Sequence, residues 1–154
     1  MRIEQKLADM GLELGMPTTP VANYIETVKS GNLLFVAGHI PFLADGSVLH
    51  TGKLGRDITE EQGYEAAKTA MVNCLVSIKG ALGDLDKVKQ VVKLFVMVNA
   101  EPDFGRQFIV ANGASDLLVE LYGDQGCHAR SAVGMGSLPL GSCVEIEMVV
   151  EVEA

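Results

Sequence analysis

The sequence predicts an α+β fold in which two helices pack on one face of a mixed β-sheet. Residues 59–83 and 102–122 place apolar side chains at the three- and four-residue spacing of amphipathic helices. Residues 143–152 alternate with the two-residue spacing of a strand, so one face is apolar and the other mostly acidic. The apolar face comprises Val144, Ile146, Met148, Val150 and Val152. A strand with this pattern lies on a hydrophobic core, which the two helices would complete as a second layer.

A short amphipathic helix is predicted at the start of the sequence. Ile3, Leu7 and Met10 recur at helical spacing, and the helix is expected to end within residues 11–15. Two prolines within residues 16–20 disfavour helix and predict an extended segment there. The sequence therefore adds a short helix to the two that cover the sheet.

A β-hairpin is predicted next. Residues 24–29 and 33–37 are strand-like and flank a turn that contains Gly31 and Asn32. The sequence Gly-His-Ile-Pro at residues 38–41 is expected to stop the second strand. Residues 48–51 could then pair as a short edge strand.

The long helix carries a start signal in its sequence. Thr59 and Gln62 match a capping box, in which each side chain binds the other residue's backbone amide. The helical pattern continues to Gly83, which is expected to end the helix. A strand over residues 88–98 and a second helix over residues 102–122 follow.

The last two strands are predicted to be neighbours. Residues 129–136 form the first strand, and residues 137–142 contain the proline and glycines of a connecting turn. On adjacent strands, Arg130 would lie near the acidic face of residues 143–152, which includes Glu145. This pairing of an arginine with a glutamate is the strongest functional lead in the sequence.

Composition sets limits on the class of protein. The 154 residues are most simply one domain, residues 1–154, of 16.4 kDa. Hydrophobic residues make up 48% and the mean hydropathy is +0.26, yet no apolar run is long enough to span a bilayer. The excess apolar surface, together with a sheet face that no helix covers, predicts contact with another copy of the chain. The charged start lacks the apolar core of a signal peptide, which favours a cytoplasmic location.

Charge and ligand spacing argue against several partners and cofactors. The net charge of −8 and the absence of a basic run disfavour binding to nucleic acid. Three cysteines form no CxxC pair and are expected to be free thiols. The three histidines lack metal-ligand spacing, so we expect no metal site, and His128 is interpreted as a surface residue. We find no phosphate loop, dinucleotide fingerprint or nucleophile elbow.

Five segments in order give the chain a family resemblance. They are residues 32–41, 110–112, 129–133, 138–139 and 144–147, which read NLLFVAGHIP, VAN, ARSAV, LP and VEIE. With these segments the chain resembles the YjgF (Rid) family from about residue 24 to its end. Its length and its extra N-terminal helix resemble the longer branch of that family, called endoribonuclease-like (L-PSP).

The resemblance implies a fold, an assembly and an activity. Members have a chorismate-mutase-like α+β fold and usually form homotrimers with ligand sites in clefts between subunits. Typical members hydrolyse reactive enamines and imines, such as 2-aminoacrylate, to a 2-keto acid and ammonia without metal or cofactor. The expected partner is therefore a small metabolite that carries a carboxylate.

The resemblance also assigns roles to individual residues. Arg130 occupies the position of the carboxylate-binding arginine, and Glu145 that of the glutamate that holds the hydrolytic water. Tyr24 matches a tyrosine that lines the cleft. The simpler alternatives are an ion pair of Arg130 with a nearby glutamate, a solvated Glu145, and a Tyr24 that serves only as an interface or core aromatic.

Three further positions are assigned to the ligand site by the resemblance. Asn112 would lie at the edge of the cleft, although packing between elements is a simpler reason for its position. Gly38 would face the ligand with its backbone. Ala132 stands where short members often have cysteine, so any contact there would come from its backbone amide.

Two other functions remain open. The same cleft could bind 2-keto acids or related carboxylates without catalysis, as a sensor. A ribonuclease activity rests on the family label alone, and the acidic charge counts against it.

Overall fold

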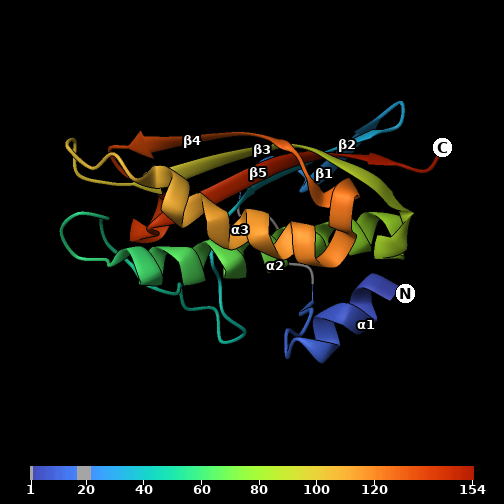
Figure 1. Ribbon diagram of the computed structural model, residues 1–154, viewed down its shortest axis with the longest axis horizontal. Helices are drawn as coiled ribbons and strands as arrows, with labels where there is room; N and C mark the ends of the chain where they lie inside the picture. Colours follow the sequence, from blue (N-terminus) through green and yellow to red (C-terminus); the bar gives the residue numbers. More distant parts are fainter. Residues whose placement is uncertain (1, 17–21) are drawn as a thin grey trace.

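The computed structural model describes residues 2–16 and 22–154 and shows a five-stranded sheet with two long helices on one face (Figure 1). The helices are α1 (Arg2–Asp9), α2 (Glu60–Leu82) and α3 (Gln107–Tyr122), with short 3₁₀ helices η1 (Leu85–Lys87), η2 (Gly123–Gly126) and η3 (Pro139–Gly141). The strands are β1 (Thr27–Ser30), β2 (Leu33–His39), β3 (Val88–Asn99), β4 (Ala129–Met135) and β5 (Val144–Val152). The predicted α+β layer architecture is confirmed. Most of the predicted extended segment at residues 16–20 lies outside the described residues.

The strands run in the order β1-β2-β5-β3-β4. All neighbours pair antiparallel except β3 and β4, which pair parallel because α3 returns the chain to the same end of the sheet. The prediction that the last two strands are neighbours is wrong, because β3 lies between β4 and β5. The connection at residues 136–143 therefore passes the end of β3 and is not a hairpin turn.

Two boundaries and one possible strand differ most from the sequence prediction. Strand β1 begins at Thr27 and not at residue 24, and α3 begins at Gln107, because Pro102 and Gly105 interrupt the turns before it. The possible edge strand at residues 48–51 forms only isolated bridges, from Val48 to Phe42 and from Thr51 to Ser142.

The ends of α2 form as the sequence predicts. The Thr59 hydroxyl accepts a hydrogen bond from the Gln62 amide at 3.1 Å, and the Gln62 side chain accepts one from the Thr59 amide at 2.9 Å. This capping box satisfies two backbone donors that the helix itself cannot use. Gly83 ends the helix with a φ of 81°, a left-handed conformation that glycine adopts without strain.

The core lies between the sheet and the two helices. It is built from the inner faces of β2, β3 and β5 and from apolar and small residues of α2 and α3. A side chain at Gly113 of α3 would overlap the carbonyl oxygen of Tyr64 in α2, so the two helices approach closely there. This close approach sets the position of α3 beside β4.

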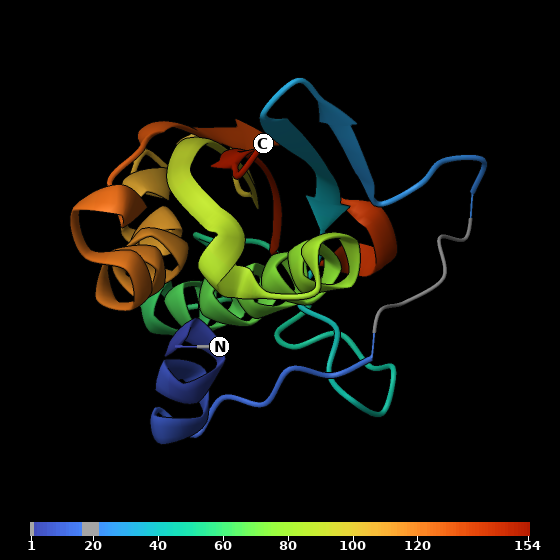
Figure 2. The same cartoon turned by 90° about the vertical axis from the view of Figure 1, so that its right-hand side faces the viewer.

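Helix α1 packs beneath the two long helices, on the side away from the sheet (Figure 2). Its Ile3 and Leu7 are buried. The Asp86 carboxylate accepts hydrogen bonds from the Arg2 and Ile3 amides, both at 2.8 Å, while Glu4 accepts one from the Leu85 amide at 3.0 Å. Asp86 thus caps the start of α1 and Glu4 caps the start of η1, and these contacts hold α1 against η1.

The opposite face of the sheet is not covered by any described element (Figure 2). Val28 and Phe35 of this face are 51% and 46% exposed, and a cavity of about 270 Å³ opens beside them. Lys93, Phe95 and Glu147 also line this cavity. The prediction that one sheet face lacks helices is confirmed.

Candidate functional site

Arg130 lies on the edge strand β4 and points toward α3. Its strand register places it beside the buried Leu94, on the helix side of the sheet. The Nη1 atom donates to Asn112 Oδ1 and to Ser115 Oγ, each at 2.9 Å. Asn112 and Ser115 are three residues apart on α3 and therefore share one face of that helix. The structure thus brings together Arg130 and Asn112, two of the predicted site residues.

The partners of Arg130 are neutral. No carboxylate in the described part of the chain lies within ion-pair distance of its guanidinium, so the alternative of an ion pair with a neighbouring glutamate is wrong within one chain. The side chain is partly buried. A partly buried guanidinium held by neutral oxygens attracts a carboxylate strongly, because its charge is not yet compensated.

Glu145 lies on β5 and faces the open side of the sheet. Its carboxylate covers Gly38 in β2, where any side chain would overlap Glu145 Oε2. The register between β2 and β5 is irregular at this point, between Val36 and His39. Gly38 and Glu145, two more of the predicted residues, are therefore in direct contact, and the glycine makes the contact possible.

Burial raises the pKa of the Glu145 carboxyl above its ordinary value, and the nearby Glu147 raises it further, while His39 lowers it. The carboxyl group therefore keeps its proton to a higher pH than an exposed glutamate does. Such a group can give and take protons closer to neutral pH.

One chain does not bring Arg130 and Glu145 together. They lie on opposite faces of the sheet, and β3 separates their strands. Ala132 shares the helix side of β4 with Arg130 and packs against the core. Tyr24 precedes β1, at the far edge of the sheet, and is 48% exposed. The predicted residues therefore form an arginine group on β4 and α3, a glutamate group on β2 and β5, and a separate tyrosine.

Two residues beside Arg130 were not assigned to the site from the sequence. Ser115 Oγ lies 2.8 Å from His128 Nε2, and His128 Nδ1 lies 2.6 Å from the carbonyl oxygen of Gly126. The interpretation of His128 as a surface residue is wrong, because its ring is partly buried and binds α3 through Ser115. Ser115 follows Asn112 by three residues and His128 precedes Arg130 by two. These two spacings were the sequence signal that could have assigned both residues to the site.

A serine, a histidine and a glutamate also meet beneath the end of β2. The Ser77 hydroxyl donates to Glu26, and His39 Nε2 lies 2.8 Å from Ser77 Oγ. His39 Nδ1 lies 2.6 Å from the carbonyl oxygen of Ala37 and must donate to it. Ser77 is buried between the His39 ring and the Glu26 carboxylate, which lies 3.4 Å from His39 Nε2, so this group links the irregular end of β2 to α2.

Comparison with known proteins decides the family. The model of a family described as "YjgF/chorismate_mutase-like, putative endoribonuclease" matches residues 4–152. The chain belongs to the YjgF family. The predicted resemblance and the predicted chorismate-mutase-like fold are confirmed.

Three relatives resemble this YjgF-family chain over nearly its whole length. "Protein TCP17" of Trypanosoma cruzi is 42% identical over 151 residues, which are 97% of this chain and 94% of that protein. The structure of Atu1372 from Agrobacterium tumefaciens, a protein with unknown function, is 42% identical, with a TM-score of 0.92 over 99% of this chain and 93% of that one. The structure of a "putative endoribonuclease" from Shewanella oneidensis is 32% identical, with a TM-score of 0.93 over 97% of this chain and 99% of that one.

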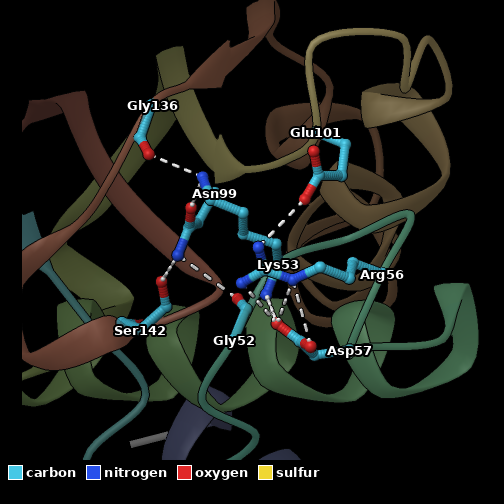
Figure 3. Close-up of polar contacts among 8 residues, drawn as sticks. All are labelled: Gly52, Lys53, Arg56, Asp57, Asn99, Glu101, Gly136 and Ser142. Carbon is cyan, nitrogen blue, oxygen red and sulfur yellow. Dashed lines mark hydrogen bonds and ion pairs between the residues drawn. The ribbon is translucent and has the colours of Figure 1, made fainter.

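A lysine network joins the loop before α2 to the sheet of the YjgF fold (Figure 3). Lys53 Nζ donates to Asn99 Oδ1 at 2.8 Å and to the Gly136 carbonyl at 2.5 Å. The Asn99 amide group in turn donates to the carbonyl oxygens of Gly52 and Ser142 at 3.3 and 3.2 Å. The network fixes the ends of β3 and β4, and the lysine is engaged by protein oxygens rather than placed in a phosphate loop.

The candidates for a metal site are few. Within the described ranges, the one group of three close His, Cys, Asp or Glu side chains is Glu4, Asp84 and Asp86. These carboxylates accept hydrogen bonds from backbone amides of α1 and η1, so they serve to dock α1.

Among the helices described, none is both long and apolar enough to cross a membrane.

Proposed function

We propose that this protein hydrolyses small reactive enamines and imines, such as 2-aminoacrylate, to 2-keto acids and ammonia. The observation that supports this function most is Arg130, a partly buried guanidinium that neutral side chains hold in place and that lacks a carboxylate partner in the described chain. A small 2-imino acid supplies that carboxylate directly beside its reactive carbon. The proposed chemistry needs neither metal nor cofactor.

The proposal gives Arg130 and Glu145 separate roles. Arg130 binds the substrate carboxylate through paired hydrogen bonds. The enamine takes a proton from solvent on its terminal carbon to become the imine, and water held by Glu145 then adds to the imine carbon as it gives a proton to the Glu145 carboxylate. Glu145 returns this proton to the nitrogen of the carbinolamine, and the C–N bond breaks with release of ammonia while the hydroxyl loses its proton to solvent, which leaves the 2-keto acid. The raised pKa of Glu145 suits a group that exchanges protons with water during these steps.

The proposed site requires two copies of the chain. Arg130 and Glu145 face opposite sides of the sheet, so they can act on one substrate only if they come from different chains. The open sheet face, with exposed Val28 and Phe35, supplies apolar surface for such an assembly. We propose the homotrimer that the family resemblance implies, with Tyr24 lining a cleft between neighbours.

The test generates 2-aminoacrylate with a serine dehydratase and follows pyruvate release. Wild type should accelerate release over buffer, whereas Arg130→Ala should not. Arg106→Ala is the matched control, because Arg106 is an exposed arginine whose 2.6 Å ion pair with Glu60 lies outside the proposed site. No acceleration by wild type, or equal rates for wild type and Arg130→Ala, would refute the proposal.

A second candidate is a non-catalytic binder of 2-keto acids. The separation of Arg130 from Glu145 within the chain favours it, since the arginine group alone can anchor a carboxylate. This function predicts saturable pyruvate binding that Arg130→Ala abolishes, with no turnover of 2-aminoacrylate.

The family description also names a ribonuclease. The net charge of −8 opposes binding to RNA. RNA cleavage by purified protein in the presence of a chelator, lost in Arg130→Ala, would favour this function over the hydrolase.

A further inference from the structure

A directed chain of hydrogen bonds runs from the Gly126 carbonyl to Arg130. A carbonyl oxygen only accepts, so His128 Nδ1 carries a proton and donates to Gly126 over 2.6 Å. In the neutral ring, Nε2 is then an acceptor, and the Ser115 hydroxyl donates to it over 2.8 Å. Ser115 Oγ still has lone pairs, and these accept the hydrogen bond from Arg130 Nη1 at 2.9 Å. Each group therefore has one consistent role.

This chain determines which edge of the guanidinium is available. Nη1 has two hydrogens, and Asn112 and Ser115 accept one each. In the described chain, no protein acceptor is bound to Arg130 Nε or Nη2. The hydrogens of these two atoms point in parallel from one edge, the geometry that matches the two oxygens of a carboxylate.

We propose that Ser115 and His128 are positioning residues that fix Arg130 so that its Nε–Nη2 edge receives the substrate carboxylate. The inference rests on the proposed function, because it assigns the carboxylate to a small 2-imino or 2-keto acid. Beyond that function, it specifies that the Nε–Nη2 edge of the guanidinium binds the carboxylate and that Ser115 and His128 make this edge available. Asn112 then acts on Arg130 and not on the ligand.

Fixing the guanidinium favours binding. A free arginine side chain loses much rotamer freedom when it grips an anion, and one already held by two acceptors loses less. Asn112 and Ser115 lie on α3, which the close contact at Gly113 holds against α2. The orientation of Arg130 is therefore set by the packed core and not by the mobility of an edge strand.

The simpler alternative is that Ser115 and His128 only hold β4 against α3. That role predicts lower stability when either side chain is removed, without a specific effect at Arg130. Paired substitutions separate the two roles. Ser115→Ala removes the hydroxyl and Ser115→Thr keeps it, while His128→Leu removes the acceptor and His128→Gln restores one near the position of Nε2.

The first measurement is pyruvate binding by calorimetry, with the melting temperature of each variant measured beside it. Ser115→Ala and His128→Leu should weaken binding by roughly 3- to 10-fold, as expected for the loss of one orienting hydrogen bond. Ser115→Thr and His128→Gln should bind within about twofold of wild type. In turnover, the same losses should appear as a higher KM with little change in kcat, because Arg130 binds the carboxylate equally before and during the reaction.

The second measurement needs no ligand. Nitrogen-15 NMR of the Arg130 guanidinium, assigned through Arg130→Lys, should show slow rotation of the Nη groups in wild type, Ser115→Thr and His128→Gln. Rotation should be fast in Ser115→Ala and His128→Leu. Equal rotation in all five proteins, or pyruvate binding unchanged by Ser115→Ala and His128→Leu, would overturn the inference.

The two measurements also separate this inference from the hydrolase proposal. In one outcome, wild type binds pyruvate but does not turn over 2-aminoacrylate, while Ser115→Ala and His128→Leu speed the rotation of the Arg130 guanidinium and weaken pyruvate binding. The positioning role then stands and the hydrolase proposal fails. In the opposite outcome, wild type turns over 2-aminoacrylate, while Ser115→Ala and His128→Leu leave KM and the Arg130 NMR signals unchanged. The hydrolase proposal then stands and the positioning role fails.

Discussion

The arginine group and the glutamate group hold their charges in opposite ways. Arg130 is fixed by neutral oxygens of α3, so no carboxylate of the described chain compensates its positive charge. Glu145 is half-buried over Gly38 and near Glu147, which raises its pKa and disfavours its negative charge. The first group suits permanent attraction of an anion, and the second suits proton exchange. In the proposed mechanism the two groups divide binding from chemistry, so substitutions should separate the two functions.

The largest expected effect comes from Glu145→Gln. This change keeps the shape of the side chain but removes its proton exchange, so kcat should fall about 100-fold or more while pyruvate affinity stays within about twofold. Turnover of 2-aminoacrylate and calorimetry measure the two quantities. Glu151→Gln, on the same face of β5, is the control and should leave both unchanged. A parallel loss of affinity in Glu145→Gln would show that the two groups do not divide the work.

Arg130→Lys should give the complementary result. Lysine keeps the charge but not the planar fork, so pyruvate affinity should fall about 10- to 100-fold. The titration of Glu145, followed by carbon-13 NMR of its carboxyl, should be unchanged in the free protein. Arg106→Lys is the control and should bind as wild type does. Retention of full affinity in Arg130→Lys would contradict recognition by a paired guanidinium edge.

Gly38→Ala tests the glutamate group alone. The added methyl would overlap Glu145 Oε2, the end of a flexible side chain, so we expect the carboxylate to move at a cost of no more than about 1 kcal/mol of unfolding free energy. Urea denaturation measures the loss, and kcat should fall while pyruvate affinity is retained. Gly105→Ala, where no atom lies within 4 Å, is the control. Unchanged stability and kcat would show that the contact between Gly38 and Glu145 is dispensable.

The smallest expected effect is the pH dependence of stability. The folded-state pKa of Glu145 is raised above its ordinary value of 4.5, so the folded protein holds this proton more tightly than the unfolded chain. The resulting stabilisation is present below the unfolded pKa and is lost as pH rises through the folded pKa. Urea denaturation between about pH 4 and pH 7 should show a smaller decline for Glu145→Gln than for wild type. Identical slopes would mean that burial does not perturb Glu145.

Local patterns in the sequence predicted the elements well. The apolar spacing located α2, α3 and the strands, and Thr59 with Gln62 identified the start of α2 because a capping box is a local signal. Gly38 and Glu145 were both assigned to the site, although their contact depends on the irregular register of β2 with β5. Such contacts follow from long-range pairing, which local spacing does not encode.

The largest error concerned the order of strands. Two strands separated by a short turn-like segment predicted a hairpin, but α3 directs β4 to pair parallel with β3, and β5 takes the other edge of β3. This order puts β3 between the strands of Arg130 and Glu145, and the strand register puts the two side chains on opposite faces, so the predicted pair becomes two separate groups. Ser115 and His128 were missed for a related reason, since their contact with Arg130 exists only after β4 packs beside α3.

The central claim is that the two groups belong to one site made by two copies of the chain. Mixing Arg130→Ala and Glu145→Gln chains in denaturant, followed by refolding, tests it most directly. Sites that take Arg130 from one variant and Glu145 from the other are intact, so an equal mixture should regain about a quarter of wild-type turnover. Turnover no higher than that of the separately refolded variants would contradict a shared site.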